Sequence, residues 1–351
     1  PAAQKIDEFL FDRLEKENLQ PNPTITDEQF VRRIYLSIIG RIPTIPEAND
    51  FLNSDSKNKH SLLAQQLLSN DAGYTAHHYQ FWADLLRIPT NVGYTLYYRE
   101  WIKDQIRENI PYDKLAHKLV SGHGLIFDNP AAAYYLRDAG MALDNMSNTV
   151  RIFLGTRLEC AQCHDHPFDR WTQKQFYEMA AFTEGAGNIR MRGSDNINAL
   201  NRLSRDEERR LARGDDNGAS RRLSNASRDI RELVTTGLAS MGKGEIRLPI
   251  DYQYDNAKPS QKLTATTIFG LAAELDENLE VTGSRSSYAN WVASESNPRF
   301  TTVIVNRLWK EVFGLALIDQ LDNIFDDAMA TDRPFRLHLE KVMVALNFGL
   351  H

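Results

Sequence analysis

The sequence predicts a mainly α-helical protein. Across most of its 351 residues, apolar side chains recur every three or four positions, which is the spacing of one face of an α-helix. Two of these runs begin with a Thr that has a Gln three residues later, a pattern that caps helix N-termini. Alternation typical of a strand is confined to residues 245–254. We therefore expect helices throughout, with one short β hairpin near residue 250.

The first third of the chain is expected to form helices joined by short turns. The apolar spacing predicts a helix over residues 5–17, ended by Pro21, and another that begins after Thr26 and stops at Gly40. The same spacing predicts five further helices, at residues 46–52, 58–69, 72–87, 94–109 and 111–120. A glycine-flanked loop at residues 121–124 follows.

The rest of the chain contains a charged stretch between helical segments. Helices are expected at residues 143–154, 172–182, 288–292, 300–313 and 335–348. Residues 188–244 mix acidic and basic side chains and contain few large apolar ones, so we expect a solvated helical excursion or a partly disordered insertion there.

Composition excludes several classes of protein. With 42% hydrophobic and 25% charged residues, the chain is typical of a soluble globular protein. Its 47 acidic and 41 basic residues give a net charge of −6, so nucleic-acid binding is not expected. No apolar run approaches the ~18 residues that a transmembrane helix needs. The first residues lack the features of a signal peptide and resemble a mature end.

Both cysteines of the sequence lie in one motif, Cys160-Ala-Gln-Cys163-His164. Cys-x-x-Cys-His is typical of covalent c-type haem attachment. Residues three apart on a helical turn point the same way, so both thiols can reach the two vinyl groups of one porphyrin edge. His164 is then placed to coordinate the iron through a ring nitrogen. The predicted cofactor is one covalently bound haem c.

Other interpretations of the motif stay open. The two thiols form a redox dithiol or a disulfide in some proteins, although a thioredoxin-like motif should follow a strand and these flanks are helical. A zinc site could combine Cys160 and Cys163 with two of His164, His166 and a distant His, but no second ligand pair follows downstream. A purely structural pair is the remaining alternative.

Further residues are candidates for the same site. Arg157 or Arg170 could pair with the haem propionates, and surface ion pairs are the alternative role for both. Asp165 and His166 either support the ligand or stabilise the turn. The distal iron ligand is expected among Met146, Met141, His123, His78 and His77, each of which has an ordinary packing or solvated role as its alternative.

The chain resembles a planctomycete-type cytochrome C-like domain of unknown function, followed by the start of its usual companion domain. Four segments carry the first resemblance, at residues 6–10, 32–44, 81–87 and 153–171. Residues 248–259 and 297–314 are similar to the companion. The resemblance implies an exported bacterial protein with its Cys-x-x-Cys-His site on Cys160, Cys163 and His164. Since the companion normally runs further, residue 351 is expected to be a truncation.

Three domain segments and three functions follow as expectations. A helical cytochrome c-like domain is expected over residues 1–185, a charged insertion or linker over 186–244, and the start of the companion domain over 245–351. The leading function is electron transfer by an exported, periplasmic monohaem module with a redox partner protein. A haem oxidoreductase with an open distal site is the second hypothesis. The third is an extracytoplasmic binding or scaffold protein, for which polysaccharide contact has no specific support.

Overall fold

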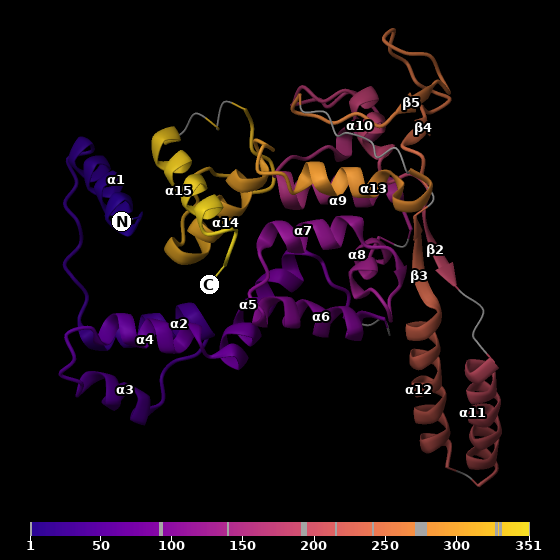
Figure 1. The fold of residues 1–351 in the computed structure, drawn as a ribbon, viewed down its shortest axis with the longest axis horizontal. Coiled ribbons are helices and arrows are strands. Elements are labelled where there is room, and N and C mark those ends of the chain that lie inside the picture. The colour runs from indigo at the N-terminus through magenta and orange to yellow at the C-terminus, as the bar shows by residue number, and fades with distance from the viewer. Residues whose placement is uncertain are drawn as a thin grey trace. The chain divides into compact units, whose positions relative to one another are not determined.

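The computed structural model describes residues 2–90, 94–138, 140–190, 195–214, 216–240, 242–270, 279–326, 329 and 332–350. It is mainly α-helical with a few short strands, as the sequence predicts (Figure 1). Two compact units divide the chain. Unit 1 comprises Pro1–Asp84, Lys103–Tyr112 and Thr301–His351, and unit 2 comprises Leu85–Ile102 and Asp113–Phe300. The boundaries expected at residues 185 and 244 remain predictions.

Unit 1 contains the N-terminal helices and the last two helices. Its elements are α1 (Ala2–Lys16), α2 (Asp27–Ile39), α3 (Ile45–Leu52), α4 (Lys59–Leu68), α5 (Asp71–Leu85), most of α14 (Phe300–Phe313) and α15 (Arg333–Ala345). Thr26 and Gln29 form the predicted capping box of α2. Gly40 ends that helix with φ 69°, a left-handed conformation that glycine adopts without steric cost.

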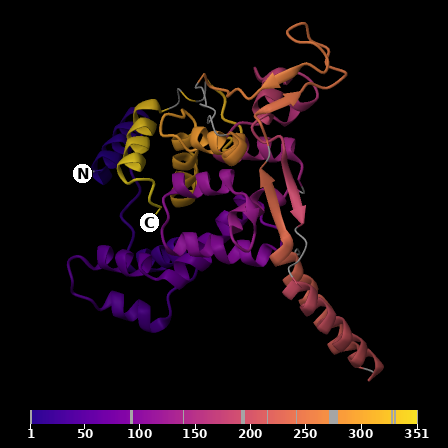
Figure 2. The same ribbon diagram turned by 45° about the vertical axis from the view of Figure 1, so that its right-hand side comes forward.

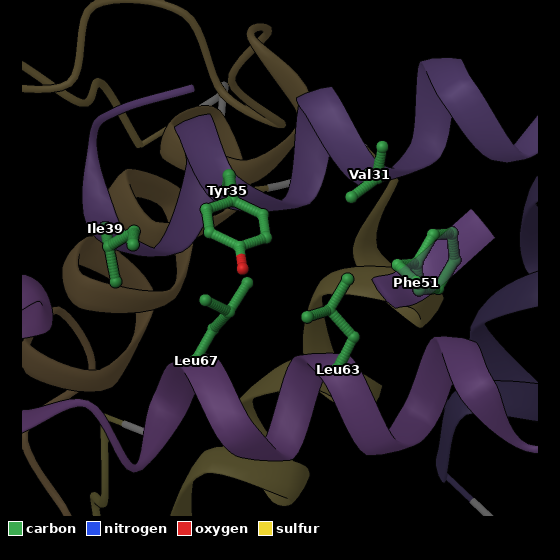
Figure 3. Close-up of a cluster of buried hydrophobic side chains, with 6 residues drawn as sticks. All are labelled: Val31, Tyr35, Ile39, Phe51, Leu63 and Leu67. Carbon is green, nitrogen blue, oxygen red and sulfur yellow. The ribbon is translucent and has the colours of Figure 1, made fainter. Parts of the chain in front are cut away.

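The core of the N-terminal helices lies between α2, α3 and α4. Figure 3 shows the side chains of α2 facing those of α4, with one ring from α3 at the end of the row. The buried residues of this core are Val31, Tyr35, Ile39, Phe51, Leu63 and Leu67. Their spacing on α2 and α4 is that of one helical face, so burial of this face holds the three helices together.

Unit 2 contains the remaining helices and all the described strands. Its helices are α6 (Thr95–Arg107) and α7 (Tyr112–Ser121), each shared with unit 1, and α8 (Ala133–Leu136), α9 (Ala142–Leu154), α10 (Gln173–Ala180), α11 (Asp195–Arg213), α12 (Asn217–Thr235) and α13 (Leu279–Val292). Two 3-10 helices, η1 (Pro130–Ala132) and η2 (Glu159–Gln162), precede α8 and α10. Helix α9 is buried on most sides: Met146, Val150 and Phe153 are completely buried, and so are polar residues such as Asn145 and Thr149.

A three-stranded antiparallel sheet, which the sequence analysis did not predict, lies in unit 2. Its order is β1 (Gly124–Leu125), β3 (Thr236–Ser240), β2 (Ala186–Arg190), and Leu238 pairs with Gly124 on one side and Asn188 on the other. Helix α12 runs directly into β3, and α11 lies beside α12 (Figures 1 and 2). Most of the described part of the charged segment is therefore a helical pair, as in the expected helical excursion, and strands β2 and β3 flank it.

The predicted hairpin near residue 250 is shorter than its sequence pattern. Strand β4 (Glu245–Arg247) pairs with β5 (Lys262–Thr264), and Ile246 lies opposite Leu263. The alternation continues to residue 254, but Pro249 has no backbone N–H to donate to a ladder. The chain therefore leaves the strand there and forms a loop between β4 and β5.

Candidate functional site

The Cys-x-x-Cys-His motif forms a 3-10 turn between α9 and α10. Cys160 lies inside η2, Cys163 directly follows it, and both thiols are free and exposed. Side chains three residues apart eclipse each other in a 3-10 helix, and Cys163 directly follows η2, so we expect the two thiols to face the same way. Ala161 between them is fully buried, and both α9 and α10 pack against the turn. The fold thus exposes two free thiols to solvent on a backbone that neighbouring helices hold in place.

His164 presents one particular ring nitrogen as a ligand atom. Its Nδ1 lies 2.8 Å from the carbonyl oxygen of Asp165, and the ring is exposed. A carbonyl oxygen only accepts hydrogen bonds, so Nδ1 carries the proton and donates it. Nε2 is then the nitrogen with a lone pair. A ligating histidine is commonly held in this way, with its other ring N–H fixed by a backbone carbonyl.

Hydrogen bonds from distant parts of unit 2 hold the turn in place. The backbone N–H of Asp165 donates to the hydroxyl oxygen of Tyr254 at 2.7 Å. The Asp165 carboxylate accepts from the backbone N–H of Gln173 at 2.8 Å, and the Gln173 side chain donates to the carbonyl oxygen of Gln162 at 3.1 Å. The turn is therefore tied to the start of α10 and to the loop between β4 and β5. These bonds fit the turn-stabilising role expected of Asp165, and the contact of its carbonyl oxygen with His164 fits the supporting role.

The residues after His164 form a closed loop that ends at a buried tryptophan. The backbone N–H of His166 donates to the carbonyl oxygen of Trp171 at 2.7 Å, and His166 Nδ1 accepts from the backbone N–H of Phe168 at 3.2 Å. Trp171 is buried, whereas the Phe168 side chain is 84% exposed. The guanidinium of Arg170 lies over the Trp171 ring, 4.6 Å from its centroid. This loop places an apolar ring in solvent four residues after His164.

Tyr177 and Tyr252 line the same region with phenol groups that stay protonated. Burial raises the pKa of Tyr177, and negative charge on Cys163 and Asp251 raises it further. Burial likewise raises the pKa of Tyr252, with the Asp165 carboxylate adding to the effect. Both phenols therefore keep a hydrogen-bond donor beside the turn over the physiological pH range. The sequence analysis identified neither residue.

The structure brings only part of the predicted set together. Arg157, three residues before Cys160, is exposed. Met146 is fully buried in α9, whereas Met141 at the start of that helix is 54% exposed. His123 is exposed, and its Nδ1 lies 3.0 Å from the carbonyl oxygen of Ser121, so its Nε2 carries the lone pair, as in His164. The two remaining candidates, His77 and His78, belong to α5 in unit 1, and their ring centroids are 5.0 Å apart.

The residues of the turn match the requirements of a covalent haem. Among the described residues, no group of three or more His, Cys, Asp and Glu side chains is arranged to hold a metal ion. A structural zinc site needs four such ligands. Covalent haem needs two accessible thiols and one imidazole with a free lone pair, and Cys160, Cys163 and His164 supply this set.

Two family models match the chain. A model described as PSCyt2, a protein of unknown function (DUF1549), matches residues 5–187, more than half of the chain. The chain belongs to this family. The whole Cys-x-x-Cys-His turn lies inside the PSCyt2 match. A second model, PSD1, also a protein of unknown function (DUF1553), matches residues 284–338. This is the planctomycete pair of cytochrome C-like and companion domains that the sequence resembles.

No curated protein and no solved structure matches the chain. Within the described ranges, no helix combines the length and the apolar character required to cross a bilayer.

Proposed function

We propose that this protein is an exported monohaem c-type cytochrome module that transfers electrons. One observation carries the proposal: two exposed free cysteines lie three residues apart at a 3-10 turn, directly before an imidazole with a lone pair on Nε2. This combination would supply the attachment points and one iron ligand for a haem. The family model is consistent with the proposal but assigns no function.

Each residue of the turn has a separate role in the proposal. Cys160 and Cys163 would hold the haem by thioether bonds, each thiol adding across one vinyl group so that sulfur bonds to one carbon and the thiol hydrogen goes to the other. His164 donates the lone pair of Nε2, and the carbonyl of Asp165 holds the ring in orientation and raises its basicity. The bound haem supplies an iron that changes by one electron between its ferrous and ferric states. Arg157 and Arg170 are the proposed partners of the propionates.

The distal ligand decides between electron transfer and oxidoreductase chemistry. Among the candidates, Met141 and His123 are accessible without any change in the core, whereas Met146 is fully buried. A Met or His in the sixth position would saturate the iron and suit electron transfer to a redox partner protein. An open sixth position would suit the binding of a small oxidant or substrate. We propose the saturated form, and a periplasmic location, because haem c is attached after export.

Covalent attachment is tested by haem staining of the denatured chain. The protein is produced in a host that matures cytochromes c, separated on a denaturing gel and stained for haem. We expect stain on the wild-type band and none on Cys160→Ala/Cys163→Ala. His60→Ala serves as the control, because it removes an exposed imidazole of unit 1 without touching the motif. A wild-type band without stain would overturn the proposal.

The visible spectrum of the haem-loaded protein then tests the proposed role. A low-spin, six-coordinate spectrum in both oxidation states is expected for the electron carrier. The variants Met141→Ala and His123→Ala should separate the two accessible candidates, since only removal of the true ligand converts the spectrum to high spin. A wild-type spectrum that is already high spin would contradict the electron carrier and support the oxidoreductase.

A further inference from the structure

Unit 1 contains a cavity, whereas the Cys-x-x-Cys-His turn belongs to unit 2. The volume of the cavity is about 450 Å³, and its walls come from α2, α4, α5, α14 and the C-terminal Leu350. This volume falls within the range of small-molecule sites in proteins. An apolar cavity of this size is unfavourable when it stays unfilled, and apolar walls hold water poorly. The size and the lining therefore favour an apolar occupant.

The walls of the cavity are rich in aromatic rings. Six of the lining residues are aromatic: Phe30, Tyr74, His78, Phe81, Trp82 and Phe313. Several of these rings already pack against each other, with centroids 4.1 Å apart for Tyr74 and His78 and 5.3 Å apart for Phe81 and Trp82. Tyr74 and Trp82 are also buried. The walls are thus fixed by packing, and their character suits a ring-bearing ligand.

Helix α2 holds one wall in place through its opposite contacts. Val31, Tyr35 and Ile39 of α2 pack into the core with α3 and α4 (Figure 3). Ile34 and Ile38, on the neighbouring face of the same helix, line the cavity. Since the first face anchors the helix, the second face cannot collapse inwards to close the space without disrupting the core.

Charged groups and exposed apolar groups meet at the rim. Arg33 on α2 and Glu311 on α14 both line the cavity and are exposed. Neither forms an ion pair with any residue in the part of the chain that the structure describes. Val312 and Ile25, which also line it, are 61% and 41% exposed, so the cavity opens to solvent. Entry therefore leads past the Arg33 guanidinium and the Glu311 carboxylate.

We propose that this cavity binds a small aromatic ligand that carries one anionic group. The ring packs between the aromatic walls, and the anion pairs with the guanidinium of Arg33, which binds carboxylate-type groups through two parallel hydrogen bonds. The Glu311 carboxylate repels a second negative charge on the ligand. The cavity thus selects for a single acidic group on an apolar ring system.

Two matched fluorescent probes test the proposal. The probes are 8-anilinonaphthalene-1-sulfonate, which is anionic, and N-phenyl-1-naphthylamine, which has the same rings without the sulfonate. We expect both to bind the wild type and both to lose binding in Ile38→Trp, which fills the cavity. Leu36→Trp is the control, because it adds the same ring on α2 at a position outside the cavity. If Ile38→Trp fails to fold by circular dichroism, Ile34→Phe replaces it.

The charge variants test whether Arg33 pairs with the anionic group of the ligand. Arg33→Gln should raise the dissociation constant of the anionic probe about tenfold, which corresponds to about 1.4 kcal/mol. The dissociation constant of the neutral probe should change by less than about twofold. Arg32→Gln, beside it and outside the cavity, should change neither probe. Glu311→Gln should strengthen binding of the anionic probe only. If the probes bind Ile38→Trp as tightly as Leu36→Trp, the cavity is not their binding site. If Arg33→Gln leaves the ratio of the two probes' dissociation constants unchanged, Arg33 does not select an anionic ligand.

Discussion

At the scale of single residues, the candidate site depends on a few hydrogen bonds that fix the turn. Asp165 carries two of them: its N–H donates to Tyr254, and its carboxylate accepts from the N–H of Gln173. The carbonyl of the same residue accepts from His164. One residue therefore connects the proposed iron ligand to α10 and to the loop after β4. Any change that loosens Asp165 should alter the orientation of the His164 ring.

Tyr254→Phe is expected to destabilise the protein by about 1 kcal/mol. The change removes the hydroxyl oxygen that accepts from the Asp165 N–H, and the partly buried donor is left without its partner. Urea unfolding of the reduced, haem-free protein measures the loss. Tyr97→Phe is the matched control, since Tyr97 is 39% exposed and should change stability by less than about 0.5 kcal/mol. Equal stability of Tyr254→Phe and wild type would show that this hydrogen bond does not hold the turn.

At the scale of elements, helix α3 shows how local chemistry starts a helix. Thr44 and Glu47 form a capping box, in which the Glu47 carboxylate accepts from the Thr44 N–H at 2.7 Å. Arg41 binds both oxygens of the same carboxylate, at 2.7 and 2.8 Å. The hydrogen bonds from Arg41, together with those from Thr44, lower the pKa of Glu47 from 4.5 to about 2. The ionised carboxylate thus serves the cap and the ion pair together.

The contribution of the Glu47 charge to the free energy of unfolding should depend on pH. A carboxyl with a lowered pKa in the folded state stabilises above its unfolded pKa of 4.5, and this stabilisation disappears as pH falls towards 2. Glu47→Gln keeps the capping box and removes the charge, so it should cost about 0.5–1 kcal/mol at pH 7 for this partly exposed pair. Unfolding by urea at a series of pH values measures the difference, which should shrink as pH falls below 4.5 and disappear only below about pH 2.

Asp55→Asn is the control for this pH series. Asp55 is exposed and has no ion pair with the described residues, so its replacement should change stability little at any pH. A cost of Glu47→Gln that stays constant between pH 7 and pH 2 would contradict the role assigned to the charge.

Local signals explain which elements could be predicted from the sequence. The capping boxes at Thr26 and Thr172 and the glycine stop at Gly40 act within a few residues, and the structure confirms all three. The pairing of Gly124 with Leu238 joins segments far apart in the chain, and two-residue β1 has too few residues to show alternation. The sheet could therefore not be predicted.

In the candidate site, too, features set by neighbouring residues could be predicted and contacts between distant residues could not. The spacing of Cys160, Cys163 and His164 alone is enough to predict a haem attachment site, and that assignment stays a prediction. The hydrogen bond between Asp165 and Tyr254 connects residues 89 positions apart, and no pattern in a single sequence marks such a contact. The 3-10 geometry of the turn likewise depends on how α9 and α10 pack against it.

At the scale of the whole molecule, a buried ion pair joins separate parts of unit 2. Arg137 and Asp138 pair at 2.6 Å, with side chains 3% and 5% exposed. Arg137 also donates to the carbonyl oxygen of Leu86, at the start of the unit. The Asp138 carboxylate accepts from Asn145 and Asn148 of α9, at 2.9 and 3.3 Å. The pair thus connects three segments, including the helix that precedes the motif.

Asp138→Ala should destabilise the protein by about 3–5 kcal/mol. The change leaves the Arg137 charge buried without its partner, and such a charge is costly in the protein interior. Guanidinium unfolding measures the effect, and Asp128→Ala, at an exposed position of the same unit, is the control with little expected loss. A loss below about 1 kcal/mol for Asp138→Ala would mean that the pair does not hold these segments together.

The most direct test of the central claim is the intact mass of the denatured wild-type protein, made in a host competent in cytochrome c maturation. We expect a mass that exceeds that of the polypeptide by one haem, with the addition located on the peptide that contains Cys160 and Cys163. A mass equal to the polypeptide alone, or a haem found on another peptide, would contradict the assignment of this turn as a haem attachment site.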